Sequence, residues 1–145
     1  MSRTPSKVDQ IADAWVDKIA ELNPTFATYI GRPGGDDKLD DHSPEAAELM
    51  IGEVKRVLGE LSAATPTDKV DEVTKDAMLE DFQLGFELHD SGLWKRDLNV
   101  IASPAQGIRD IFDLSPTATE HDWENLSKRM RAVPEAIDGY IRSLR

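Results

Sequence analysis

The chain contains no cysteine, only three histidines and no long run of apolar residues. Without cysteine, disulfide bonds, thiolate metal sites and a cysteine nucleophile are excluded. A membrane-spanning helix needs about 20 apolar residues in succession, and the chain has no such run. A signal peptide needs an apolar core near the N-terminus, where this chain carries Asp9, Asp13 and Asp17 instead. We therefore expect a cytoplasmic protein with no membrane partner.

Basic residues are scarce relative to acidic ones. The 17 Lys and Arg residues stand against 28 Asp and Glu residues, which gives a net charge of −11. Such a field repels phosphate backbones and anionic lipid surfaces, so nucleic acid is not expected as a partner. Hydrophobic residues make up 39% and charged residues 31% of the 145 residues. This composition and length predict one folded domain over residues 1–145.

Apolar residues recur at helical spacing along most of the chain. The first predicted helix has one apolar face, formed by Val8, Ile11, Ala12, Trp15, Ile19 and Leu22. Pro24 ends it, a short helix around Phe26 stops at Gly31, and residues 32–42 have the composition of a loop. A further helix begins at Ser43-Pro44-Glu45 and ends before Pro66. No segment is a convincing strand, so we predict an all-α fold, an irregular bundle or array of about five to seven helices.

The second half of the chain predicts the remaining helices. Residues 68–89 carry apolar side chains over a wide arc, which is typical of a central helix with neighbours on more than one side. Ser91-Gly92 ends this helix. Thr117 and Glu120 fit a capping box that begins a later helix. Three of its residues are expected to face inward: Trp123, Leu126 and Met130. Pro134 begins a last helical pattern, which runs to the end of the chain.

The densest polar cluster lies in the stretch Arg96–Asp110, which opens a helix with a complete start signal. Ser103 can cap the helix, Pro104 suits its first position, and Gln106 stands where a capping box requires it. The same stretch supplies the candidate substrate-facing residues: Arg96, Asp97, Asn99, Gln106 and Arg109. A local alternative stays open. In that alternative Arg96 pairs with Asp97, Gln106 completes the capping box, and Arg109 reaches Asp113 one turn later.

The residues that could hold a metal are dispersed. A zinc hydrolase requires clustered imidazoles and a carboxylate, usually His-Glu-x-x-His on one helix face. His42, His89 and His121 are each isolated in the sequence, which favours structural or solvent roles. The acidic loop 36–41 does not supply the oxygen ligands of a calcium hand at the required positions. We expect neither metal ligands nor catalytic residues in this chain.

Several short phrases occur in the order found in one bacterial family. They are Asn23–Gly31, Asp40–Glu45, Arg96–Pro104, Asp110–Leu114, Trp123 and Arg131–Pro134. Together they resemble the bacterial domain of unknown function 885 family, over essentially the whole chain from Val8 onward. The resemblance implies the N-terminal part of a much longer, zinc metallopeptidase-like protein. The His-Glu metal-binding motif of that family has no match here, so it is expected downstream.

The resemblance also implies a role, namely a scaffold and cleft wall for a peptidase of unknown substrate. The segment from Arg96 to Arg109 would face the cleft. The expected partners are the missing C-terminal part of the protein and a peptide substrate, with zinc as cofactor of the full-length protein. The pattern that stops at Arg145 fits both a natural terminus and a cut. A fragment would expose an apolar patch, through which two copies can form a homodimer. The competing hypothesis is a self-contained helical interaction module without enzymatic activity.

Overall fold

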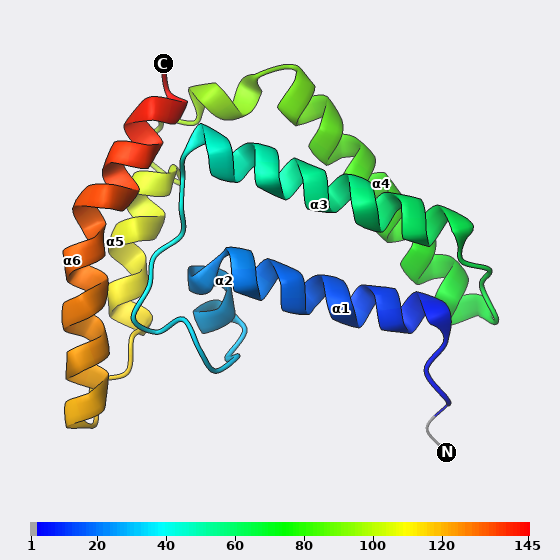
Figure 1. The fold of residues 1–145 in the computed structure, drawn as a ribbon, viewed down its shortest axis with the longest axis horizontal. Coiled ribbons are helices and arrows are strands. Elements are labelled where there is room, and N and C mark those ends of the chain that lie inside the picture. Colours follow the sequence, from blue (N-terminus) through cyan, green and yellow to red (C-terminus); the bar gives the residue numbers. More distant parts are fainter. Residues whose placement is uncertain (1–2) are drawn as a thin grey trace. The chain divides into compact units, whose positions relative to one another are not determined.

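The computed structural model describes residues 3–145, which form helices joined by loops (Figure 1). Six α-helices and one short 3-10 helix, η1, follow one another in this part of the chain: α1 (Lys7–Leu22), α2 (Pro24–Tyr29), α3 (Pro44–Ala63), α4 (Lys69–Asp90), η1 (Leu93–Arg96), α5 (Pro104–Leu114) and α6 (Glu120–Ser143). None of the described residues belongs to a strand. The all-α prediction and the predicted number of helices are therefore confirmed.

The chain divides into two compact units that interleave in sequence. The first unit combines the chain up to Lys18 with Glu48–Leu93, and the second combines Ile19–Ala47 with Trp94–Arg145. The division falls inside α1 and inside α3. The expectation of one domain over residues 1–145 stays a prediction.

The first unit has an apolar core supplied by α1, α3 and α4. Its buried residues are Val8, Ile11, Val54, Val57, Leu61, Ala64 and Phe82. Trp15 of α1 packs edge-on against Phe82 of α4, with the ring centroids 5.2 Å apart. The residues from α1 and α3 lie at three- and four-residue steps, and those from α1 belong to the apolar face that the sequence predicts. Gly92, with a φ of 70°, follows the end of α4 as expected of a residue that suits the left-handed conformation.

A buried carboxylate joins the N-terminal segment to the start of α4. The side chain of Asp71 is fully buried and accepts hydrogen bonds from the Thr67 amide at 2.8 Å, the Thr67 hydroxyl at 2.7 Å and the Ser6 hydroxyl at 2.8 Å. Arg3 reaches the same carboxylate at 2.9 Å. Burial by itself raises the pKa of Asp71, but these hydrogen bonds outweigh it and hold the pKa below its ordinary value. The ionised carboxylate therefore fastens two segments 65 residues apart.

In the second unit α5 packs against α2 and α6. Figure 1 shows α5 and α6 side by side. Ile108 and Ile111 of α5 are buried, as are Ala136 and Tyr140 of α6. The loop before α3 lies close to α6, because a Cβ added at Gly139 would lie 3.2 Å from the Ser43 amide nitrogen. Only glycine fits this approach without displacing the loop.

Polar contacts also join the loop before α3, and the first turn of α3, to the end of α6. The Ser143 hydroxyl donates to the His42 carbonyl at 2.6 Å, and Arg142 pairs with Glu45 at 2.9 Å. The predicted start of α3 is confirmed, because the Ser43 hydroxyl accepts from the Ala46 amide at 3.2 Å. The pKa of Glu45 is lowered by its own backbone amide and by Arg142.

The expectation that residues 68–89 form a central helix is wrong. The helix exists, and Asp68 caps it through the Asp71 amide, but α4 buries only one side. Phe82 is buried, whereas Val70, Val73 and Leu88 are exposed. The width of an apolar arc shows how much of the helix surface can be buried. It does not specify how many neighbouring helices cover that surface.

Three expectations for the last helix are corrected. Pro134 does not begin a helix but lies inside α6. The carbonyl of Met130, which loses its usual donor there, belongs to an exposed residue, so water can hydrogen-bond to it. The capping box uses Thr119 and Asp122 instead of Thr117 and Glu120, with the Thr119 amide donating to Asp122 at 2.8 Å. Finally, Trp123 and Met130 are exposed, because α6 turns other residues towards its unit.

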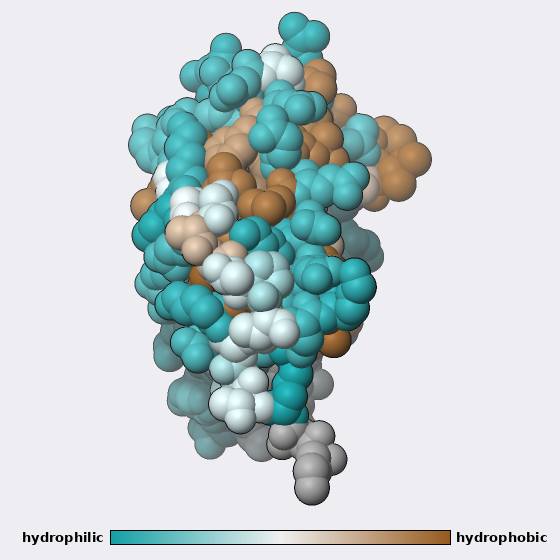
Figure 2. All heavy atoms as spheres, turned by 90° about the vertical axis from the view of Figure 1, so that its right-hand side faces the viewer, coloured by the Kyte–Doolittle hydropathy of each residue, from teal (hydrophilic) through white to brown (hydrophobic). Residues whose placement is uncertain are grey.

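Large hydrophobic side chains remain exposed on several elements. On the face drawn in Figure 2, hydrophobic residues emerge as brown patches among hydrophilic ones. The most exposed are Val100 at 91% and Ile101 at 83%, which follow η1. Within residues 3–145, none of the helices combines the length and the apolar character needed to cross a membrane.

Candidate functional site

The stretch Arg96–Asp110 folds into a turn that leads into α5. The side chain of Asn99 builds this turn, since its Oδ1 accepts from the Ile101 amide at 2.9 Å and from the Ala102 amide at 2.8 Å. Its Nδ2 donates to the Asp97 carboxylate at 3.2 Å. An asparagine that bonds to the backbone two and three residues later fixes the turn in one conformation. Asp97 and Asn99 therefore shape the backbone here.

The capping box predicted at the start of α5 is present. Oε1 of Gln106 accepts from the Ser103 amide at 3.0 Å and also from the Ser103 hydroxyl. Nε2 of Gln106 donates to the Asn99 carbonyl at 3.1 Å, which ties the cap to the turn before it. Gln106 thus serves the local role that the alternative hypothesis assigned to it.

The turn is also anchored to α6. The hydroxyl of Tyr140, a buried residue, donates to the Asp97 carbonyl. The two residues are 43 positions apart, so no local sequence pattern predicts this contact. Together with the asparagine turn and the capping box, it restrains the backbone from Asp97 to Gln106 at both ends.

The two arginines of the predicted set point to solvent. Arg96 is exposed at the end of η1. The side chain of Arg109 is 77% exposed, with one nitrogen 2.8 Å from Asp110 and another 3.9 Å from Asp113. Arg109 thus makes the local contact with Asp113 that the alternative describes, and its role towards a substrate stays a prediction. The structure brings Asp97, Asn99 and Gln106 together and leaves Arg96 and Arg109 outside their hydrogen-bond network.

The outer surface of the turn is apolar. Leu98 is 66% exposed, Val100 91% and Ile101 83%. Asn99, which lies between them, is exposed too and bonds to the backbone of the turn. The sequence expectation named only the polar residues of the stretch, and the structure adds these three apolar residues to its surface. The signal that sequence reasoning missed is that these aliphatic residues flank an Asx-turn asparagine, out of step with any helical period. We call Leu98, Val100 and Ile101 the aliphatic turn.

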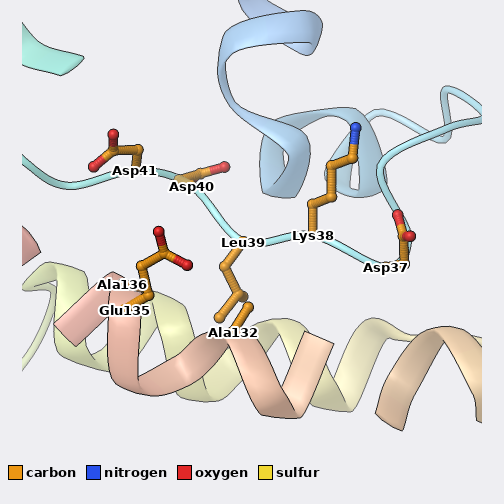
Figure 3. Close-up of a pocket in the computed structure, with 8 residues that line it drawn as sticks. All are labelled: Asp37, Lys38, Leu39, Asp40, Asp41, Ala132, Glu135 and Ala136. Carbon is orange, nitrogen blue, oxygen red and sulfur yellow. The ribbon is translucent and has the colours of Figure 1, made fainter. Parts of the chain in front are cut away.

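A cavity lies between loop 36–41 and α6 (Figure 3). It is a cavity of about 280 Å³, lined by Asp37, Lys38, Leu39, Asp40, Asp41, Ala132, Glu135 and Ala136. In the close-up Leu39 points towards α6 and Lys38 points away from it. Two of its carboxylates have structural partners, because Asp40 accepts from the Thr25 amide at 2.9 Å and Asp41 from the Ser43 amide at 2.8 Å. They stabilise the first turns of α2 and α3.

A buried arginine holds loop 36–41 in place. Arg129 of α6 is fully buried, and its guanidinium donates to the carbonyls of Lys38 and Gly35, both at 2.9 Å. It also donates to the hydroxyls of Ser115 at 2.9 Å and Thr28 at 3.0 Å. Burial lowers the pKa of Arg129, and the neighbouring aspartates of the loop oppose that shift. Sequence reasoning missed this residue, although its seven-residue spacing from buried Ala136 places it on the packed face of α6.

The three histidines lie on separate elements. His42 is half-buried, its ring centroid lies 6.4 Å from that of Tyr140, and burial lowers its pKa. His89 has its Nε2 3.2 Å from Glu48, and exposed His121 lies 3.8 Å from Glu124. Within residues 3–145 no three His, Asp or Glu side chains gather as metal ligands would. The described residues therefore do not fit the zinc that the family resemblance implies.

Residues 24–145 match the family described as bacterial protein of unknown function, DUF885. The chain belongs to this family. No curated protein matches it. The DUF885 match includes the aliphatic turn, the acidic loop and the whole of α6, so the second unit lies largely inside it. The description of DUF885 states no activity, and the peptidase implied by resemblance remains an expectation.

Proposed function

We propose that this chain is the N-terminal scaffold and cleft wall of a peptidase-like protein whose catalytic motif lies downstream. The observation that carries the proposal is the aliphatic turn, three large apolar side chains held outward on a restrained backbone. A restrained loop loses little conformational entropy on binding, so its apolar contacts contribute more fully to affinity. The natural ligand for such a surface is an extended peptide with apolar side chains.

The predicted substrate-facing residues take a supporting part in this proposal. Asn99 and Gln106 position the turn, and the exposed Arg96 and Arg109 lie on either side of it in sequence. Cationic groups there would attract the carboxylates of a peptide without doing chemistry on it. The chemistry would come from zinc and its ligands in the downstream part, as the family resemblance implies.

The test is made in the longer protein in which this chain precedes a His-Glu motif. Val100→Asp and Ile101→Asp are expected to lower kcat/KM for an apolar peptide at least about tenfold, because a desolvated carboxylate opposes apolar contact. The melting temperature should not change, since both side chains are exposed. Val73→Asp, on the exposed side of α4, is the matched control and should keep full activity. Unchanged kinetics in both turn variants would contradict the proposal.

The second candidate is a self-contained helical interaction module. The observation that favours it is a set of exposed apolar residues on α4, namely Val70, Val73 and Leu88. Such a surface can bind a partner protein without a peptide cleft. The gene sequence after Arg145 separates the two candidates, because a stop codon supports the module and a His-Glu motif supports the peptidase. Stoichiometric zinc binding by the 145-residue chain in a calorimetric titration would contradict the peptidase proposal in its present form.

A further inference from the structure

Helix α6 and the residue after it form a second, mostly apolar stripe that the second unit leaves partly uncovered. Its packed face carries Arg129, Ala136, Tyr140 and Ser143, all buried. The other stripe recurs at alternating steps of four and three residues: Trp123, Ser127, Met130, Pro134, Ile137, Ile141 and Leu144. Trp123 is 56% exposed, Met130 60% and Ile141 40%. A mean step of 3.5 residues is the spacing at which one helix packs along another.

We propose that two copies of this chain associate through this stripe, with the two α6 helices antiparallel. In the pairing we propose, the twofold axis passes between Glu135 and Ala136. Met130 then meets Ile141 of the second copy, and Pro134 meets Ile137. Ser127, the smallest residue of the stripe, meets Leu144. This proposal is independent of the function proposed above, because it uses a different surface.

A hollow on α6 fits this register. It measures about 360 Å³ and is lined by Glu120, Trp123, Glu124, Ser127, Lys128 and Arg131. The small side chain of Ser127 leaves the hollow open beside the Trp123 ring. In the proposed pairing Leu144 of the second copy lies over it, which is the fit of a side chain into a space on the opposite helix.

Charges beside the stripe are complementary to a second copy. Glu124, Arg131, Asp138 and Arg145 recur every seven residues along one edge of the stripe and alternate in sign. The antiparallel register brings Arg131 close to Asp138 of the second copy, and Glu124 close to Arg145. The twofold axis repeats both pairs. Exposed ion pairs add little affinity, but they select the direction and register of helix pairs.

The charge balance of α6 selects this face over the other exposed stripe. Helix α4 exposes Val70, Val73, Leu84 and Leu88, but it carries seven acidic residues and two lysines. Two such helices would repel each other. Helix α6 carries five acidic and four basic residues, one of which is the buried Arg129. It is therefore less acidic than α4, and two copies can approach along it even though each chain has a net charge of −11.

Sedimentation equilibrium of the 145-residue chain over a wide concentration range tests the proposal, with a reversible monomer–dimer equilibrium expected. Met130→Glu should weaken the dimer at least about tenfold, because it places a carboxylate in the apolar seam. Leu84→Glu, an equally exposed leucine on α4, is the matched control and should leave the dissociation constant unchanged. Circular dichroism checks that both variants keep their helices. A chain that stays monomeric, or a dimer that only Leu84→Glu weakens, overturns the proposal.

A charge exchange tests the register. Arg131→Asp and Asp138→Arg should each weaken the dimer about threefold, because each places like charges together. The double variant restores the pairing with the charges reversed and should recover most of the loss. If the double variant is no tighter than the single variants, the antiparallel register is wrong and the proposal falls with it.

Discussion

At the scale of single residues, the second unit depends on a charged group that is buried against neutral partners. The guanidinium of Arg129 donates to two carbonyls and two hydroxyls and has no carboxylate within its hydrogen bonds. Five N–H donors in a rigid fork can satisfy several backbone acceptors at once, which no apolar residue does. This residue decides where the loop between α2 and α3 lies.

Replacing Arg129 should be costly. Arg129→Met removes the donors and leaves buried acceptors unsatisfied, so we expect the free energy of unfolding to fall by about 3 kcal/mol. Urea denaturation followed by circular dichroism measures the change. Lys128→Met, at an exposed position of the same helix, should change stability by less than about 0.5 kcal/mol. Equal effects of the two substitutions would show that the buried network is not needed.

Asp71 makes the first unit sensitive to acid. Its pKa is lower in the folded chain than the ordinary value of about 3.9 expected in the unfolded chain. The stabilisation is therefore complete above the unfolded value and is lost as the pH falls through the folded one. Asp71→Asn should melt below the wild type at pH 7, and the difference should shrink below about pH 4.

Thermal unfolding at pH 7, 4 and 2.5 measures this difference. Asp76→Asn removes an exposed carboxylate from the same helix, and it should follow the wild type closely at every pH. A gap between the wild type and Asp71→Asn that is equally wide at all three values would contradict the role of the ionised carboxylate.

At the scale of elements, helix starts were the most predictable features of the chain. Ser43 and Ser103 begin α3 and α5 where their sequence signals place them, and α4 follows Asp68, the first residue of the predicted range. These signals act within about four residues, so the sequence contains all the information they need. The start of α6 was misplaced by two residues, because Thr117 and Thr119 each have an acidic residue three positions later and the structure uses Thr119 with Asp122.

The capping box of α5 gives a test at this scale. Gln106→Ala removes the acceptor for the Ser103 amide and the donor to Asn99, so a loss of about 1 kcal/mol is expected. Hydrogen exchange at the amides of residues 100–103 should become faster. Arg109→Ala, one turn later and exposed, should leave the exchange of these amides unchanged. Unaltered exchange in the Gln106 variant would mean that Asn99 and Tyr140 hold the turn without the capping box.

Element interiors were harder to assign than element starts. Pro134 has the sequence character of a helix breaker, yet α6 continues through it because the freed carbonyl lies on an exposed side. Val70 and Trp123 belong to apolar arcs, yet both are exposed. Which part of a wide arc is buried depends on the neighbouring element, and no local pattern contains that neighbour.

At the scale of the whole molecule, sequence patterns were enough to predict the fold class and the family, but not the functional site. Helical periodicity and the lack of a convincing strand sufficed for an all-α prediction, and the ordered phrases sufficed for the DUF885 family. The polar set at Arg96–Asp110 was only partly understood. The role of each of its residues depends on its hydrogen-bond partner, and such a partner can be distant in sequence. Tyr140, which donates to the Asp97 carbonyl, lies 43 residues away from it.

The sequence by itself determined the all-α class, the caps of α3 and α5, the net charge and the family, because each of these depends on neighbouring residues or on simple sums. Only the tertiary structure decided that Arg129 and Asp71 are buried anchors and that Leu98, Val100 and Ile101 point to solvent. Those outcomes depend on contacts between segments far apart in the chain. A buried charge is stable only where distant groups complete its hydrogen bonds, and a side chain is exposed only where no distant element covers it.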